Sequence, residues 1–176
     1  TCDWSSDVCS SDLALMVSAV PRLRRYARAL AGDHAAADDL VQDTLQRAWT
    51  RIDTWQHGAD MRAWLFSILH NLHVDQRRRP GLTTVALDDE ALELPVRASQ
   101  TDGLDMRDLE TALQQILPEQ REVLLLVALE DMSYEEIART LGVPLGTVMS
   151  RLSRGRSRLR GVMEGRIQPR ILKVVK

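Results

Sequence analysis

The residues in this sequence that are best suited to bind a ligand lie near its C-terminal end, on one predicted helix. If Val148 and Leu152 face a core, the outward side of that helix carries hydroxyl and guanidinium groups: Thr147, Ser150, Arg151, Arg154 and Arg158, flanked by Arg156. Such groups bind phosphates and guanine edges. Residues 145–176 hold nine Arg and Lys against Glu164 alone, so the pattern predicts a DNA-binding face. The alternative is a solvated basic helix within a bundle.

A helix-turn-helix is the element that would position this face. Ser133 and Glu136 have the spacing of a capping box and predict the start of a short helix. The segment from Gly142 to Pro144 ends that helix, and the following helix runs to about Met163. A short helix, a tight corner and a longer helix are typical of proteins that place the longer helix in the major groove of DNA.

Another polar face is predicted on a helix in the N-terminal half. Opposite an apolar stripe through Val41 it carries acidic and amide side chains: Asp39, Gln42, Asp43 and Gln46. This face either docks a protein partner or is a solvated surface on which Asp43 pairs with Arg47, a contact worth ~0.3–0.5 kcal/mol.

The next predicted helix carries a third polar face, which includes Ser67, Asn71, Asp75 and Arg78. It ends in Arg77, Arg78 and Arg79. These arginines either grip phosphate or interact favourably with the C-terminal end of the helix macrodipole.

Other kinds of site have little support in the sequence. His70 and His73 lack further ligands at metal-binding spacing, and no nucleophile, paired base or glycine-rich phosphate loop is recognisable. We therefore expect no enzyme activity, no cofactor and no metal. Trp49 and Trp64 are predicted core residues, whereas Trp55 could lie in the core or stack on unpaired bases.

The composition favours an all-α fold of two small helical domains joined by a flexible linker. Apolar residues make up 44% of the chain but aromatic residues only 4%, and neither half alternates with the period of a strand. No run reaches the ~20 apolar residues of a membrane helix, which favours a cytoplasmic protein without membrane insertion. The predicted parts are a non-native or disordered tail (1–13), a helical domain (14–80), an acidic linker (81–105), a four-helix domain with the helix-turn-helix (106–165) and a basic tail (166–176).

The two halves resemble the second and fourth conserved regions of bacterial sigma factors. The first resemblance rests on DLVQDTLQRAW at residues 39–49 and MRAWLFSILHNL at residues 61–72. The second rests on LPEQREV at residues 117–123, SYEEIA at 133–138 and LGVPLGTVMSRL at 141–152. Two such modules joined directly by a linker are typical of extracytoplasmic-function sigma factors, which are alternative sigma factors that direct promoter-specific transcription initiation.

The resemblance implies a role for each polar face. Asp39, Gln42, Asp43 and Gln46 would dock on core RNA polymerase, whose largest and second-largest subunits are the implied partners. The residues implied to read the promoter -10 element as a single strand are His57, Arg62, Asn71, Asp75, Arg77, Arg78 and Arg79. The face from Thr147 to Arg158 would read the -35 element as duplex DNA. An anti-sigma protein is a further candidate partner.

Two positions depart from the family pattern, and one rival interpretation stays open. Gly155 lies inside the predicted recognition helix, where glycine costs ~1 kcal/mol relative to alanine. Met149 occupies a position that is often basic in the family. The rival is a self-sufficient helix-turn-helix regulator, which would bind duplex DNA tightly without polymerase.

Overall fold

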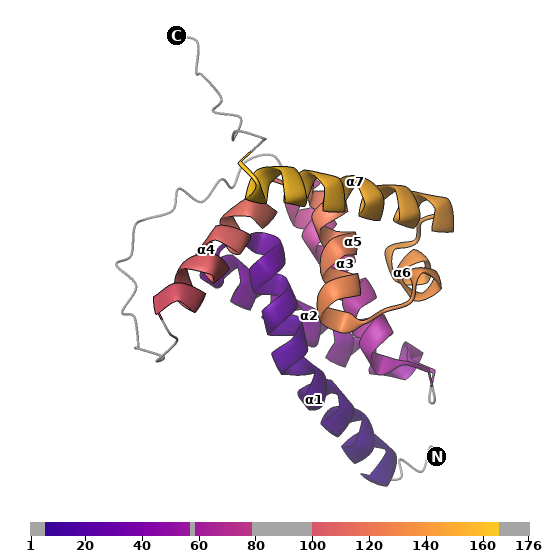
Figure 1. Ribbon diagram of the computed structural model, residues 1–176. Coiled ribbons are helices and arrows are strands. Elements are labelled where there is room, and N and C mark those ends of the chain that lie inside the picture. Colours follow the sequence, from indigo (N-terminus) through magenta and orange to yellow (C-terminus); the bar gives the residue numbers. More distant parts are fainter. Residues whose placement is uncertain (1–5, 57–58, 79–99, 166–176) are drawn as a thin grey trace.

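The computed structural model describes residues 6–56, 59–78 and 100–165, and all regular structure in these ranges is helical (Figure 1). The elements are α1 (Ser6–Ala31), α2 (His34–Thr50), the short 3-10 helix η1 (Ile52–Thr54), α3 (Met61–Arg78), α4 (Gln100–Gln114), α5 (Pro118–Glu130), α6 (Tyr134–Leu141) and α7 (Leu145–Met163). The predicted all-α class with a four-helix C-terminal domain is confirmed.

Local signals explain how the N-terminal helices are joined and packed. Gly32 adopts a left-handed conformation (φ 76°) between α1 and α2, and the Asp33 carboxylate accepts a hydrogen bond from the Ala36 N–H at 2.8 Å. These two residues end one helix and start the next. The Tyr26 ring on α1 meets the Phe66 ring on α3 edge to face, with centroids 5.0 Å apart. Both rings are buried in the core that α1, α2 and α3 share.

Helices α5 and α6 begin, and α6 ends, where the sequence predicts. Pro118 occupies the first turn of α5. At the start of α6, Glu136 N–H donates to the Ser133 hydroxyl oxygen at 3.2 Å, and Ser133 N–H donates to the Glu136 carboxylate at 2.7 Å. Gly142 ends α6 in a left-handed conformation (φ 64°). The capping box and the corner of the helix-turn-helix are therefore confirmed.

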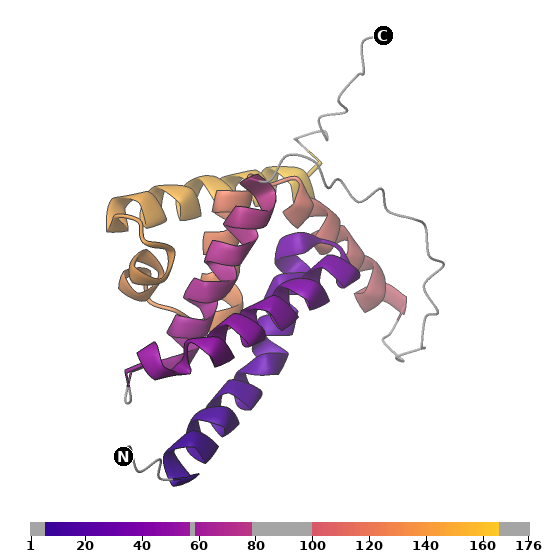
Figure 2. The same ribbon diagram turned by 180° about the vertical axis from the view of Figure 1, so that it is seen from behind.

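The two groups of helices pack against each other. Helix α1 lies against α5, and α3 lies against α6, so one hydrophobic cluster runs through both groups. Helix α7 crosses the ends of α5 and α6 with its far side open (Figure 1), and the view from behind shows α3 alongside them (Figure 2).

The structure differs from the predicted boundaries in two places. Helix α1 begins at Ser6, so the predicted tail 1–13 is helical from that residue, in a stretch that contains neither proline nor glycine before Leu13. Helix α4 begins at Gln100, inside the predicted linker 81–105. The apolar periodicity of this stretch is weak, so the sequence pattern did not indicate a helix there. Residues 79–99 of the linker region and the predicted basic tail 166–176 lie outside the described residues.

The three tryptophans of the N-terminal domain have different environments. Trp49 is 52% exposed, so the prediction that it belongs to the core is wrong. Trp64 is half-buried and packs against the core cluster, and Trp55 is buried at 6% exposure. The apolar stripe passes through Ala48, which is buried. Trp49 is the next residue and therefore points ~100° away from the stripe, toward solvent.

Candidate nucleic-acid interface

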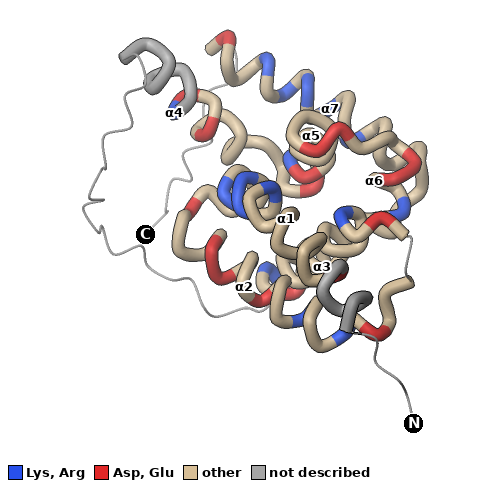
Figure 3. The backbone as a smooth tube through the Cα atoms, turned by 90° about the horizontal axis from the view of Figure 1, so that it is seen from below, with Lys and Arg blue, Asp and Glu red and all other residues tan. Residues whose placement is uncertain are grey.

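Helix α7, the second helix of the helix-turn-helix, buries one side and exposes the other, as its sequence predicts. Val148 and Leu152 are buried against α5 and α6. On the other faces Arg154 and Arg156 are exposed, while Thr147, Ser150 and Arg151 are partly exposed. Basic residues recur along α7 in Figure 3, whereas α6 begins with acidic residues. The hydroxyl and guanidinium groups predicted for DNA binding are thus gathered on one helix.

Arg158 differs from the other residues of this face. It is half-buried, and its Nε–H donates to the Gln115 carbonyl oxygen at 3.0 Å, just beyond the end of α4. Carbonyls at a helix C-terminus lack partners within the helix, so a nearby guanidinium is a natural donor. The structure therefore gives Arg158 a contact within the protein that the predicted outward face did not include.

Gly155 has a packing role that offsets its low helix propensity. It is buried where α7 crosses α5, and a Cβ atom at this position would lie 2.9 Å from Leu124 Cδ1 and 3.3 Å from Gln120 Cβ. Glycine therefore allows α7 to approach α5 closely. Met149, the other departure from the family pattern, is 48% exposed on α7.

The predicted docking face on α2 is open to solvent. All four of its members, Asp39, Gln42, Asp43 and Gln46, are exposed. Within the described residues the Asp43 carboxylate has no ion pair within 4.0 Å, so the alternative in which it pairs with Arg47 is not what the structure shows. The exposed Trp49 lies on the same helix, close to its C-terminal end.

The predicted -10 residues fall into two environments on α3. Asn71, Asp75, Arg77 and Arg78 are exposed on its C-terminal half. Arg62, in its first turn, is only 25% exposed, and its guanidinium donates to the Glu130 carbonyl oxygen at 2.7 Å and contacts the Asp60 carboxylate at 3.3 Å. His57 and Arg79 lie outside the described residues.

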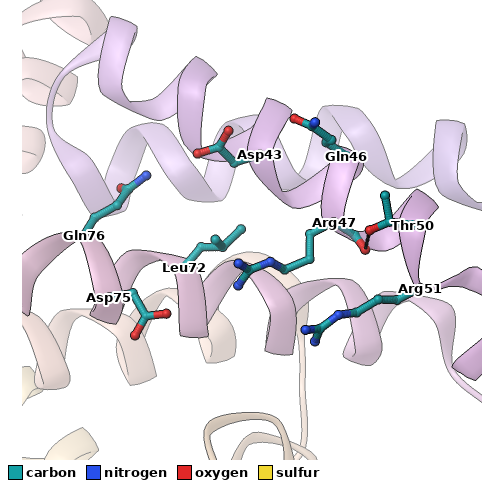
Figure 4. Close-up of a pocket in the computed structure, with 8 residues that line it drawn as sticks. All are labelled: Asp43, Gln46, Arg47, Thr50, Arg51, Leu72, Asp75 and Gln76. Carbon is teal, nitrogen blue, oxygen red and sulfur yellow. Dashed lines mark hydrogen bonds between the residues drawn. The ribbon is translucent and has the colours of Figure 1, made fainter.

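A groove between α2 and α3 brings together residues from two of the predicted faces. Its volume is about 470 Å³, and Figure 4 shows the side chains that line it: Asp43, Gln46, Arg47, Thr50 and Arg51 from the α2 side, and Leu72, Asp75 and Gln76 from α3. The predicted docking face and the predicted -10 face therefore meet along this groove.

A buried polar cluster between the two groups of helices was not predicted. Glu130, at the end of α5, has a fully buried side chain that lies 2.9 Å from Arg22 Nε and 3.5 Å from Arg25 Nη2 on α1. The Arg22 approach is an ion contact rather than a well-aligned hydrogen bond. Arg25 also donates to the Leu129 carbonyl oxygen at 2.6 Å. The C-terminal end of α5 is thus held to α1 by charge.

The other end of α5 is attached to both α1 and α4 by a buried arginine. The Arg121 guanidinium donates to the carbonyl oxygens of Leu113 at 2.7 Å, Leu30 at 2.6 Å and Gln114 at 2.9 Å. Burial, and then the charge of Arg77, lower the pKa of Arg121. These bonds supply donors to carbonyls at the C-terminal ends of two helices.

Glu122 links α5 to α3. Its carboxylate hydrogen-bonds His70 Nδ1 on α3. Burial, reinforced by the nearby charges of Glu122 and Glu130, raises the pKa of Tyr26 well above its usual value. Burial also lowers the pKa of His73 on α3. The sequence carried one signal of this cluster, because Glu122 and Glu130 flank the apolar run 123–129, which leaves neither of them on a continuous polar face.

The described part of the chain contains neither a metal-ligand cluster nor a membrane-spanning helix. There, no three His, Cys, Asp or Glu side chains lie together as ligands for a metal ion. Nor does any described helix combine the length and apolar character needed to span a membrane.

Comparison with protein families finds two matches that together cover both halves. Residues 16–70 match the family described as the Sigma2 domain of PhyR, and residues 106–159 match Sigma-70, region 4. The ECF RNA polymerase sigma factor EcfG of Rhodopseudomonas palustris is 40% identical over 149 residues, which cover 84% of this chain and 82% of that protein. SigL of Mycobacterium tuberculosis is 36% identical over 134 residues, 74% of this chain and 76% of that protein.

Two solved structures, one of them of a sigma factor, have the same fold. The sigma factor RpoE of Bartonella quintana, in complex with the anti-sigma factor NepR, matches with a TM-score of 0.71 and 34% identity, covering 90% of this chain and 97% of RpoE. CnrH, in complex with the cytosolic domain of CnrY, matches with a TM-score of 0.67 and 26% identity, covering 89% of each chain. The chain therefore belongs to the ECF family of RNA polymerase sigma factors, the alternative sigma factors that direct transcription.

Proposed function

We propose that this sigma factor binds core RNA polymerase through α2, and that it reads the -10 element as a single strand with α3 and the -35 element as duplex DNA with α7. The observation that carries this proposal is the exposure of three distinct polar faces in one chain of this family. Polymerase supplies the catalysis, and the sigma subunit supplies sequence choice. The site of action is the cytoplasm, where core polymerase and promoters are found.

The α2 surface has the character of a protein-docking face. Asp39 and Asp43 offer negative charge to a basic partner, which favours rapid and specific association. Trp49 adds a large exposed aromatic ring at the end of the same helix, and such rings often dominate binding energy at protein interfaces. We therefore extend the docking face to Trp49.

The α3 and α7 surfaces suit different forms of DNA. A recognition helix with guanidinium groups fits the major groove of a duplex, where arginine binds guanine edges in bidentate fashion. Opening the -10 element and extruding a base costs a few kcal/mol, which amide and carboxylate contacts such as those of Asn71 and Asp75 help to recover.

Transcription with purified core polymerase tests the function and the docking face. Addition of the chain should produce promoter-specific transcripts, and Asp43→Arg should abolish both transcription and polymerase binding while the chain remains folded. The matched control is Glu110→Arg, which reverses an exposed acid on α4. Tight, sequence-specific duplex binding by the chain alone, without any association with core polymerase, would support the regulator interpretation instead.

Duplex binding by the holoenzyme tests the α7 face. Arg151→Ala and Arg154→Ala should each weaken recognition of the -35 element by ~1–3 kcal/mol if these side chains reach base edges. Arg24→Ala on α1 removes the same charge from an exposed position elsewhere. Equal affinities for all three variants would show that the α7 arginines are only solvated.

An anti-sigma protein is proposed as a further partner. RpoE and CnrH, whose structures this chain resembles, are each held by an anti-sigma factor or by the cytosolic domain of a partner protein. Co-purification of the tagged chain from uninduced cells, followed by identification of a stoichiometric small protein that inhibits transcription, tests this partner.

A further inference from the structure

Two arginines in the groove between α2 and α3 belong to none of the three predicted polar faces. Arg47 lies in the last turn of α2, Arg51 caps the C-terminal end of this helix four positions later, and both residues are exposed. Figure 4 shows their guanidinium groups projecting from the same side of α2, over α3 and toward Leu72 and Asp75. The groove therefore presents two neighbouring guanidinium groups beside the predicted -10 face, together with the carboxylates of Asp43 and Asp75.

These two guanidinium groups have no acidic partner among the described residues. Neither lies within 4.0 Å of a carboxylate oxygen, although Asp43 and Asp75 line the same groove. Arg24 and Arg28 on α1 have the same spacing but face the Asp38 carboxylate at 4.0 and 3.9 Å. The groove pair is thus available for charge-assisted hydrogen bonds to a ligand.

We propose that Arg47 and Arg51 bind backbone phosphates of the promoter strand whose bases α3 reads. This inference rests on the proposed function and adds a phosphate-binding site on α2. Planar guanidinium groups bind phosphate oxygens in bidentate fashion. The Asp75 carboxylate on the facing wall can accept a hydrogen bond from the exocyclic amine of cytosine, so the groove offers donors for the backbone and an acceptor for a base.

Charge complementarity favours DNA over the polymerase as the occupant of this groove. A protein that docks on Asp39 and Asp43 presents positive charge to α2, and like charges that face each other cost free energy. The arginine pair would repel such a partner. We therefore assign the acids to the polymerase and the arginines to DNA, with Asp43 at the border between the two surfaces because it also lines the groove.

The salt dependence of promoter binding tests the assignment. The holoenzyme is assembled from core polymerase and the full chain, and its affinity for a promoter whose -10 element is single-stranded is measured over a range of salt concentrations. Each phosphate contact on a single strand contributes about 0.7 to the slope of log affinity against log salt, so Arg47→Ala with Arg51→Ala should flatten the slope by about 1.4. Arg47→Lys with Arg51→Lys should keep most of the slope, because the charge remains.

Arg24→Ala with Arg28→Ala is the matched control. It removes the same charge at the same spacing from a neighbouring helix, and the slope should not change. An unchanged slope in the Arg47 and Arg51 double variant overturns the phosphate assignment, and so does a loss of affinity for core polymerase, which would assign the groove to the polymerase. Failure of the unaltered chain to direct any promoter-specific transcript would instead contradict the proposed function itself.

Discussion

The contact between Glu130 and α1 allows a quantitative test of how the two groups of helices are held together. The Glu130 side chain is fully buried, whereas Arg22 and Arg25 are 43% and 56% exposed. Breaking a fully buried ion pair costs roughly 3–5 kcal/mol, mainly because a charge is left buried without a partner. Here the arginines left behind can be rehydrated, so we expect Glu130→Ala to lower the free energy of unfolding by about 2–3 kcal/mol, which includes the loss of buried methylene groups.

Glu130→Gln separates charge from packing. The amide keeps the volume and can still accept a hydrogen bond from an arginine, so this variant should cost about half as much, roughly 1–1.5 kcal/mol. The assay is urea unfolding with linear extrapolation. Glu119→Ala, an exposed acid in the first turn of the same helix, should change stability by less than about 0.5 kcal/mol. If Glu130→Ala costs no more than Glu119→Ala, the buried cluster does not stabilise the packing of α5 on α1.

Three further predictions concern caps, titration and close packing. Ser133→Ala should cost ~1 kcal/mol in urea unfolding. The main cause of the lowered pKa of Glu136 is the backbone N–H of residue 133, which alanine keeps, so the variant should largely retain the stability that this carboxylate contributes above its unfolded pKa and loses as pH falls through its folded pKa. Burial lowers the pKa of His73, so the contribution of this residue to the free energy of unfolding should be constant above pH ~6.5. Below that pH the contribution should decline, because the unfolded chain takes up the proton first, and His73→Gln should reduce the decline. Gly155→Leu should lower the thermal unfolding temperature through a clash with Leu124 worth ~1–3 kcal/mol, and an unchanged temperature would contradict the close α5–α7 approach.

The helix boundaries that could be predicted from the sequence are those set by local chemistry. The capping box at Ser133, the left-handed Gly142 and the proline at the start of α5 act within a few residues of themselves, so their meaning does not depend on the rest of the fold. The start of α4 could not be found in this way. Its first turns carry few apolar residues in a regular pattern, and composition alone favoured a linker.

The exposed residues of the candidate site were also accessible from the sequence, because a periodic apolar stripe defines the opposite side of each helix. This reasoning gave the α7 face and the docking face on α2. The prediction for Trp49 was wrong, because it followed the large apolar side chain and not the position of the residue beside the stripe. The position of Trp49 on α2 alone predicts an exposed ring.

The contacts of the buried polar cluster could not be predicted, because the residues that meet in it are distant in the sequence. Arg25 contacts Glu130 across 105 positions, and Arg121 reaches the Leu30 carbonyl across 91. Charged residues are usually exposed, so a sequence pattern assigns them to the surface. Only the packing of α5 against α1 shows that these groups are buried together and satisfy one another.

Helix α3 contributes to both the packing between the domains and the proposed DNA surface, and Arg62 belongs to both. Asn71 and Asp75 are exposed and can meet a DNA strand without any rearrangement. The Arg62 guanidinium, in contrast, donates to the Glu130 carbonyl oxygen at 2.7 Å, and it cannot hydrogen-bond a promoter base with the same N–H while that contact persists. If Arg62 reads the -10 element, it must therefore use another of its five N–H groups or give up its bond to α5. For this one N–H, base recognition and the contact between α3 and α5 are mutually exclusive.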